Sequence, residues 1–496
     1  MTLEREAKFA VDPDFVLPDL SAPGDGLRGR AMGTERFVST YHDTDDLRLI
    51  RWGGSLRMRT GEGWTVKLPL AADGVVVARH EIVFEGAGDR PPAQAVDLVR
   101  GFLRGGRLEP VARLQTVRRR TCIAAGDDAR PVAEVVDDEV SVLDGRRVVD
   151  RFREIEVELA DGVEPATVAP VLASIAAGTR SVTLISKVAR ALGAQAVAAP
   201  DVVVPDVGPA SAVRDVIAWA IAGSVVRLIE HDAAVRSGED PEGVHQARVA
   251  TRMLRSHLRT FGSMLEPDWR DELRAELRWL GDEFGAVRDL DVLEERVRRH
   301  ASALPDDEAG GVAKVLERVH RRREAARTEM LSAMHEPRYI ELLDALVDAA
   351  VNPRVRAEVG GVPATDVLGV VMDAPWKHLR SRCRALGATP ADAALHDARI
   401  RAKRVRYAAE SLVPVFGKPA RRFARRAEAL QQVLGAHQDA VMAMAWLRHE
   451  AMHAPVRMAF VAGRLTAIEA SVRDDARAGW PAAWERLRRT RPRFWR

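Results

Sequence analysis

The spacing of apolar residues changes along the chain, and this change constrains the fold more than any other feature of the sequence. Up to about residue 191, short β-rich segments with apolar residues at every second position are separated by Gly, Asp or Pro. From about residue 211, apolar residues recur at three- and four-residue spacing over long stretches. At 496 residues the chain is also too long for one core, so we expect a modular α+β protein.

The two patterns give domain boundaries. We expect residues 1–192 to form an antiparallel β-barrel or tunnel with flanking helices, and residues 212–490 to form an all-α bundle. Segment 193–211 is rich in Ala, Val, Pro and Gly and nearly free of charge, which is typical of an extended linker.

Composition indicates the compartment. Cys122 and Cys383 are the chain's two cysteines, which argues against a disulfide framework and for a reducing environment. The first residues are charged where a signal peptide has an apolar core. The longest apolar run, residues 216–226, is shorter than the roughly 20 residues that span a bilayer. We therefore expect a cytoplasmic protein with no membrane partner.

Charged residues alternate with mostly apolar ones in several of the predicted strands. In "EREAK", Glu4, Glu6 and Lys8 share one strand face, because successive side chains point to opposite faces. The same alternation recurs in other segments, which contribute Arg57 and Arg59, Lys67, Arg79 and Glu81, Arg118 and Arg120, and Glu154, Glu156 and Glu158.

Two interpretations of this alternation stay open. For a single strand, a charged face is usually a solvated one. The strands are partly segregated by sign, however, with carboxylates on the first and last strands and cations mainly on the middle ones. A closed barrel would gather both sets around one axis, where carboxylates would bind Mg²⁺ and cations would bind phosphate oxygens. This arrangement suits a complex of a metal and a polyphosphate.

At these residues the sequence resembles the CYTH family, the triphosphate tunnel metalloenzymes. "EREAK" supplies the family's ExExK signature, followed in order by "YHDT", "LRMR", "VKLP", "ARHE", "REIEVEL" and "SKVARAL". The resemblance implies an eight-stranded tunnel, Mg²⁺ or Mn²⁺ as cofactor, and catalytic roles for Glu4, Glu6 and Lys8. The metal ligands that it implies are Glu4, Glu6, Glu156, Glu158 and Asp138. The substrate contacts that it implies are Arg57, Arg59, Lys67, Arg79, Arg118, Arg120 and Lys187.

Some assignments within this resemblance stay open. In "AEVVDDEV" the acidic member is Asp137 or Asp138, and parity with Glu134 favours Asp138. The reaction that the resemblance favours is hydrolysis of inorganic triphosphate or a related triphosphate. A non-catalytic polyphosphate-binding adaptor and a class IV-type adenylate cyclase are the alternatives.

The helical half contains an internal repeat. "VHQARVATRMLRSHL" aligns with "LHDARIRAKRVRYAA", so that His245 matches His396 and Arg252 matches Lys403, each pair 151 positions apart. Downstream, "LGDEFGAVRD" aligns with "LQQVLGAHQD" at a separation of 150 positions. We therefore expect a duplicated helical bundle.

Each repeat carries a stripe of cationic residues on one helix face, at offsets of 3, 7 and 10 from its His. A solvated basic face is the alternative, but the stripe is duplicated together with its leading His. Candidate ligands are phosphate-rich polymers, and the scarcity of aromatic residues disfavours nucleic acid. The stripe residues are His245, Arg248, Arg252, Arg255, His396, Arg399, Lys403 and Arg406, and Arg259 continues the first stripe.

These repeated patterns resemble the CHAD domain over about residues 212–490, with "LHDARIRAKRVRYAAE" as the most specific segment. CHAD domains are associated with polyphosphate binding, so the stripe residues become the expected anion site. The expected partners are inorganic triphosphate or polyphosphate, with an expected association with polyphosphate granules. Arg401 and Arg404 lie off the stripe.

Overall fold

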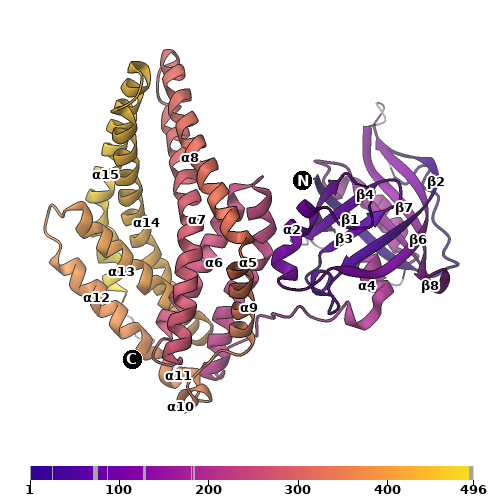
Figure 1. Cartoon of the computed structure of the whole chain (residues 1–496), viewed down its shortest axis with the longest axis horizontal. Coiled ribbons are helices and arrows are strands. Elements are labelled where there is room, and N and C mark those ends of the chain that lie inside the picture. The colour runs from indigo at the N-terminus through magenta and orange to yellow at the C-terminus, as the bar shows by residue number, and fades with distance from the viewer. Residues whose placement is uncertain are drawn as a thin grey trace. The chain divides into compact units, whose positions relative to one another are not determined.

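The computed structural model describes two compact units, Met1–Asp201 and Val202–Arg496. The first unit is a β-sheet with short helices and the second is helical, which confirms the predicted α+β multidomain class (Figure 1). The described residues are 2–24, 26–70, 76–86, 88–126, 130–179, 181–182, 185–490 and 495.

Nine described strands and several short helices make up the first unit. The strands are β1 (Thr2–Val11), β2 (Leu27–Asp43), β3 (Ser55–Arg59), β4 (Gly63–Pro69), β5 (Val77–Phe84), β6 (Glu109–Ala125), β7 (Arg130–Asp144), β8 (Arg147–Leu159) and β9 (Ser181–Val182). The helices are α1 (Arg48–Arg51), α2 (Ala93–Leu103), α3 (Ala169–Ala176) and α4 (Lys187–Leu192), with 3-10 turns at Pro165–Val168 and Gly193–Gln195.

The sheet closes into a ring through β1. Its strand order is β5-β4-β3-β2-β6-β7-β8-β1-β9, and β1 also pairs with β5. All of these pairings are antiparallel; Lys8 lies opposite Glu156 of β8, and Glu4 lies opposite Arg79 of β5. Since every inward position is fixed by period-two alternation, this register aims the charged residues of β1, β5 and β8 at one interior.

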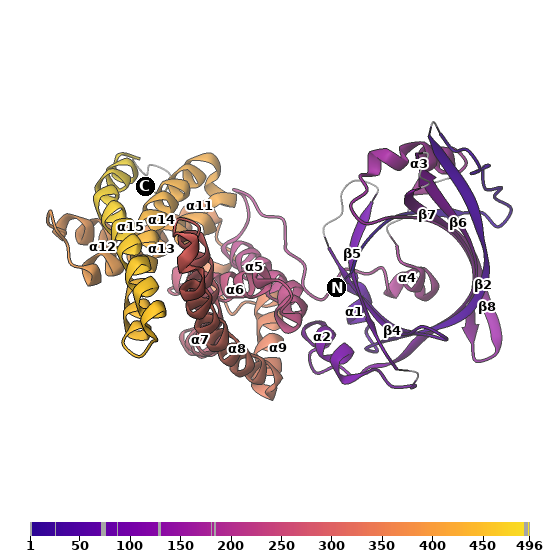
Figure 2. The same ribbon diagram turned by 90° about the horizontal axis from the view of Figure 1, so that it is seen from above.

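Apolar residues cover the outside of the ring and fill one end of its interior. On the outside, Phe9 and Ile155 pack in a cluster with Ile175 of α3. Inside, Phe152 packs in a cluster with Val188 of α4. Seen end-on in Figure 2, α4 lies within the outline of the ring. The charged part of the interior is therefore bounded at one end by an apolar plug.

Part of the segment predicted as a linker is hydrogen-bonded to the first unit. The Arg51 guanidinium donates to the carbonyl oxygen of Ala199 at 2.8 Å and 2.6 Å. The indole N–H of Trp52 donates to Asp201 at 2.9 Å. The segment up to Asp201 is thus attached to the first unit.

The second unit is built from long helices. They are α5 (Val213–Ser237), α6 (Pro241–Thr260), α7 (Pro267–Ala301), α8 (Ala309–His335), α9 (Pro337–Val351), α10 (Ala357–Gly360), α11 (Ala364–Val367), α12 (Asp373–Ala385), α13 (Asp392–Ser411), α14 (Val413–Ala451) and α15 (Val456–Arg489), with 3-10 turns at Asp306–Glu308 and Leu368–Met372. No helix among the described residues combines the length and the apolar character needed to cross a membrane.

The helices of the second unit form two similar bundles. In sequence order, α5 packs on α6, α6 on α7 and α7 on α8, and the same succession recurs from α12 to α15. The aligned repeat motifs occupy α6 and α7 in the first bundle and α13 and α14 in the second. Helix α6 also packs on α13, and Leu293 of α7 shares an apolar cluster with Leu447 of α14 and Leu465 of α15. The two repeats therefore join through α6 and α13, and through α7 and α8 with α14 and α15.

Candidate functional site

The first candidate site is a cavity of about 150 Å³ inside the ring. Its polar lining comes from seven strands and from α4, because each strand contributes its inward-facing positions. The lining includes ten of the residues predicted from the sequence, namely Glu4, Lys8, Arg57, Arg59, Lys67, Arg79, Arg118, Glu156, Glu158 and Lys187.

Three predicted residues lie outside this lining. Glu6 is buried next to the cavity and accepts an ion pair from Arg79 at 3.1 Å. Asp138 is fully buried, whereas its neighbour Asp137 pairs with Arg153 at 2.8 Å. Arg120 lies apart from the cavity and binds Glu134 at 2.9 Å and Glu35 at 3.2 Å.

Buried charges of both signs hold the predicted phosphate contacts in place. Lys187 contacts three carboxylates, Asp138 at 2.9 Å, Glu154 at 2.9 Å and Glu156 at 2.6 Å. Lys8 lies 2.6 Å from Glu156. Arg118 lies 2.7 Å from Asp138 and 3.5 Å from Glu156. These three carboxylates and three cations, which we call the buried charge cluster, balance in formal charge.

The pKa shifts follow from this mutual compensation. Burial by itself lowers the pKa of Lys187, but Asp138, Glu154 and Glu156 raise it well above its ordinary value. Burial likewise raises the pKa of Glu156, yet Lys187 and Lys8 bring it well below the usual range. Burial raises the pKa of Glu154, whereas compensation favours the charged forms of Glu156 and Lys187. The ion pairs keep the cations in fixed positions around the cavity.

Three carboxylates form a separate group that fits a hard metal ion. Oxygens of Glu4, Glu6 and Glu158 all lie within 4.8 Å of one another, the one such group found among the described residues. Carboxylate oxygens are the ligands that Mg²⁺ and Mn²⁺ prefer. Lys67 lies 2.6 Å from Glu4, so a cation already faces this group. Burial, together with Glu156 and Glu4, raises the pKa of Glu158 to about 7.

The cavity also contains residues that the sequence interpretation did not assign. Tyr41 lies opposite Arg57 in the β2–β3 register, and Glu62 binds Arg59 at 2.9 Å. Burial raises the pKa of Tyr41, but Arg57 and Lys187 lower it overall. Strand parity was the available signal for Tyr41, because its position opposite Arg57 follows once the two strands are paired.

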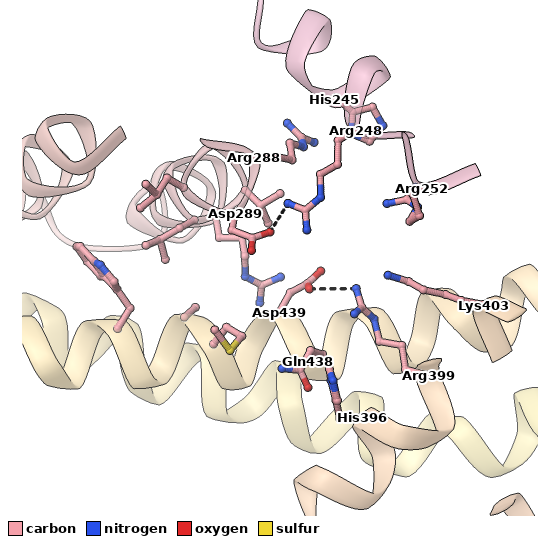
Figure 3. A pocket seen from close by; sticks show the side chains of 17 residues that line it. His245, Arg248, Arg252, Arg288, Asp289, His396, Arg399, Lys403, Gln438 and Asp439 are labelled. Atoms are coloured by element: carbon pink, nitrogen blue, oxygen red, sulfur yellow. Dashed lines mark hydrogen bonds and ion pairs between the residues drawn. The ribbon is translucent and has the colours of Figure 1, made fainter. Parts of the chain in front are cut away.

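The second candidate site is a groove of about 540 Å³ between the two repeats. Helices α6 and α13 contribute the cationic stripes, and α7 and α14 contribute the rest (Figure 3). The lining includes six predicted residues, His245, Arg248, Arg252, His396, Arg399 and Lys403, together with Arg288, Asp289, Gln438, Asp439 and an apolar part formed by Leu290, Val292, Leu293, Met442, Ala443 and Trp446.

Each repeat pairs its first stripe arginine with an aspartate on the next helix. Arg248 lies 2.6 Å from Asp289 and donates to the carbonyl oxygen of Gly285 at 2.9 Å. In the second repeat, Arg399 lies 3.7 Å from Asp439. Figure 3 shows both pairs facing the same space. Two carboxylates thus compensate part of the positive charge that the groove gathers.

Lys403 lies among several other cations of the groove. It faces Arg399 on its own helix, Arg248 and Arg252 on α6, and Asp439 on α14. Burial, followed by the repulsion from Arg399 and Arg252, lowers the pKa of Lys403 to about 7. Its counterpart in the first repeat is Arg252.

Arg255 and Arg406, also predicted as stripe residues, do not line the groove. Arg406 lies 2.6 Å from Glu410 and 3.0 Å from Glu428. Arg255 occupies the equivalent place in the first repeat. The helical period correctly puts these arginines on the stripe, but the groove ends one turn before them.

Breaking the buried charge cluster should destabilise the first unit. Asp138→Asn removes one of its three carboxylates, so the free energy of unfolding should fall by about 3 kcal/mol. Glu139→Gln removes a neighbouring carboxylate whose side chain is 49% exposed and pairs with Arg119, so the loss should stay below about 1 kcal/mol. Urea unfolding followed by tryptophan fluorescence measures both variants. Equal losses would show that the cluster does not hold the ring together.

Comparisons with known proteins agree with both resemblances. Residues 2–181 match the CYTH domain and residues 220–448 match the CHAD domain. The chain is 32% identical over 519 residues to the uncharacterized protein Rv2226 of Mycobacterium tuberculosis strain H37Rv, covering 98% of this chain and 96% of that protein. It is 31% identical, with the same coverage, to the uncharacterized protein MT2285 of strain CDC 1551.

Solved structures were also compared. PptA from Streptomyces chartreusis is 21% identical, with 55% of this chain and 100% of that chain covered and a TM-score of 0.47. The CHAD domain from the plant Ricinus communis is 28% identical, with 59% and 96% covered and a TM-score of 0.47. A putative adenylate cyclase from Bacillus halodurans is 20% identical, with 38% and 98% covered and a TM-score of 0.25.

The matched segments lie on the units that carry the two sites. The CYTH match includes β1 to β8, seven of which line the ring cavity, and the CHAD match includes α6, α7, α13 and α14, which line the groove. Both domains occur in one chain whose relatives align with it along nearly its whole length. The chain therefore belongs to the proteins in which a CYTH domain is fused to a CHAD domain.

Proposed function

We propose that the ring cavity hydrolyses inorganic triphosphate or a related triphosphate with the help of a divalent metal ion. The observation that carries this proposal is the placement of Glu4, Glu6 and Glu158 in one interior with unpaired or weakly paired cations. The CYTH family is one of triphosphate tunnel metalloenzymes and implies a divalent metal. Phosphoryl transfer needs positioning and charge stabilisation more than a protein nucleophile, and this lining suits that need.

We propose different roles for the charged residues in and next to the cavity. Glu4, Glu6 and Glu158 would hold Mg²⁺ or Mn²⁺, which supplies neutralisation of phosphate charge and activation of a water molecule. Arg57 has no ion pair with a carboxylate among the described residues, although Tyr41 and Glu81 act on its guanidinium. Its Nε lacks a hydrogen-bond partner, so this nitrogen would bind a phosphate oxygen. Among the described carboxylates Arg59 has an ion pair with Glu62, whose side chain is 51% exposed, and it would exchange that partner for substrate.

Glu156 and Asp138, which the sequence suggested as metal ligands, have a different proposed role. Their oxygens contact Lys8, Lys187 and Arg118. We propose that Glu156 and Asp138 hold these cations in position, so that the cations would face the phosphate chain in the cavity.

The groove between the repeats is the proposed binding site for longer polyphosphate. Arg248, Arg252, Arg399 and Lys403 converge there from two helices, with two aspartates to oppose them. A polyanion would compensate this charge and would localise the protein on long chains. The second candidate function is that of a non-catalytic adaptor, which would bind polyphosphate in the groove without hydrolysing a triphosphate in the ring cavity.

Removing a metal-side carboxylate should abolish hydrolysis. Glu4→Gln or Glu6→Gln keeps the side-chain shape but removes a ligand charge, so phosphate release from triphosphate should fall at least about a hundredfold. Polyphosphate binding by the helical unit should not change. The control Glu139→Gln alters a carboxylate outside the cavity. Unchanged release in both variants would contradict the proposed metal site.

Removing groove cations should weaken polyphosphate binding. Arg252→Ala combined with Lys403→Ala deletes one cation from each stripe, and the affinity should fall by about tenfold or more. Arg401→Ala is the control, because Arg401 pairs with Asp397 at 3.1 Å and does not line the groove. Titration of the full chain with polyphosphate measures the effect. Equal losses for the double variant and the control would indicate a diffuse basic surface.

Polyphosphate affinity should depend on pH through Lys403. With a pKa of about 7 in the free protein, Lys403 is mostly neutral above that pH, and a bound polyanion would favour its charged form. Affinity should therefore fall as pH rises from about 7, by at most about tenfold per pH unit. Lys403→Arg, which copies Arg252, should remove this part of the pH dependence. An identical pH profile in the variant would exclude Lys403 as the titrating group.

A further inference from the structure

The two repeats differ in charge at one set of equivalent positions. In the second repeat, Arg406 is neutralised by Glu410 and Glu428, at 2.6 Å and 3.0 Å. The repeat separations of 151 and 150 positions put arginines in the places of both glutamates. The equivalents of Arg406, Glu410 and Glu428 are Arg255, Arg259 and Arg278. These positions thus hold one arginine and two glutamates in the second repeat and three arginines in the first.

Two more arginines join this cationic cluster. Arg274 comes from α7 and Arg404 comes from α13, and both lie near enough to Arg259 to repel its charge. Arg259 and Arg278 are exposed to solvent. We call Arg255, Arg259, Arg274, Arg278 and Arg404 the lateral cluster, and none of them lines the groove.

Little in the protein compensates the lateral cluster. Among the described residues, Arg274 has an ion pair, with Asp271 at 3.1 Å, and the other four have none. Asp282 is the carboxylate that acts on Arg255. Burial, then repulsion by Arg404 and Arg274, lowers the pKa of Arg259 to about 10. Arginines held together in this way favour an anionic ligand, because binding it relieves their repulsion.

The cluster continues the path of the groove along α6. Arg252 lines the groove, and Arg255 and Arg259 follow it by one and two turns. At 1.5 Å per residue, Arg252 and Arg259 are about 10 Å apart along the helix axis. A flexible polyanion that leaves the groove at Arg252 therefore meets the lateral cluster next, whereas a ligand that fills only the groove does not reach it.

Building on the proposed polyphosphate binding, we infer that the lateral cluster is a second contact site for the same chain, engaged only by long polyphosphate. The protein would then discriminate chain length by contacts outside the groove. The cluster also makes Arg404 unsuitable as an off-stripe control, although Arg401 remains suitable because it is paired with Asp397.

The second repeat supplies the variant that tests this inference. Arg259→Glu combined with Arg278→Glu recreates around Arg255 the arrangement of one arginine and two glutamates that Arg406 already has, so the fold should tolerate the change. Affinity of the full chain for long-chain polyphosphate should fall by about tenfold or more, with a salt dependence flatter by about two units of slope. Affinity for inorganic tetraphosphate, used as a probe too short to extend beyond the groove under this inference, should stay within about twofold.

A matched charge reversal controls for net charge. Arg298→Glu combined with Arg299→Glu changes two exposed arginines elsewhere on α7 by the same total charge. The inference is overturned if this control weakens long-chain binding as much, or if the lateral variant binds long chains as the wild type does. If the wild type binds no polyphosphate, or if Arg252→Ala with Lys403→Ala has no effect, the proposed groove function itself is wrong. Circular dichroism of both variants confirms that the helices are intact.

Discussion

The compensation of buried charge inside a closed ring is the constraint on which the first unit depends. Lys187 on α4 reaches three carboxylates of β7 and β8, and Lys8 on β1 contacts one of them. Isolated charges would be too costly to bury there, but paired charges are tolerated. The same ion pairs that stabilise the interior also fix cations next to the carboxylates that we propose as metal ligands. Stability and the proposed chemistry therefore draw on one set of residues.

The helical unit applies the same rule with less compensation. Each repeat opposes one arginine with one aspartate in the groove, at Arg248 with Asp289 and at Arg399 with Asp439. The remaining groove cations face one another, and burial together with this repulsion lowers the pKa of Lys403 to about 7. A site with this excess of positive charge suits a ligand that is itself a chain of negative charges. Duplication then extends such a surface without new folding elements.

Much of the fold could be predicted from local sequence patterns, because period-two alternation and helical periodicity each depend on nearby residues. They correctly gave the fold class, and they placed Lys8 and Glu156 on inward faces. Both domain families were identified by the resemblance of specific motifs, such as "EREAK" and "LHDARIRAKRVRYAAE". Alternation does not say where a long strand leaves the ring, so Arg120 shares a face with Arg118 yet lies apart from the cavity. Likewise, the packing of α6 on α13 decides which stripe residues line the groove. This packing joins segments that are far apart in the sequence, so local patterns do not predict it.

The central claim is that the ring cavity turns over a triphosphate with a divalent metal. The most direct test measures phosphate release by the full chain from inorganic triphosphate, ATP and long polyphosphate, each with Mg²⁺, with Mn²⁺ and with a chelator. We expect release to require metal and to be fastest with inorganic triphosphate. No release from any substrate under any of these conditions, or formation of cyclic AMP from ATP in its place, would contradict the account.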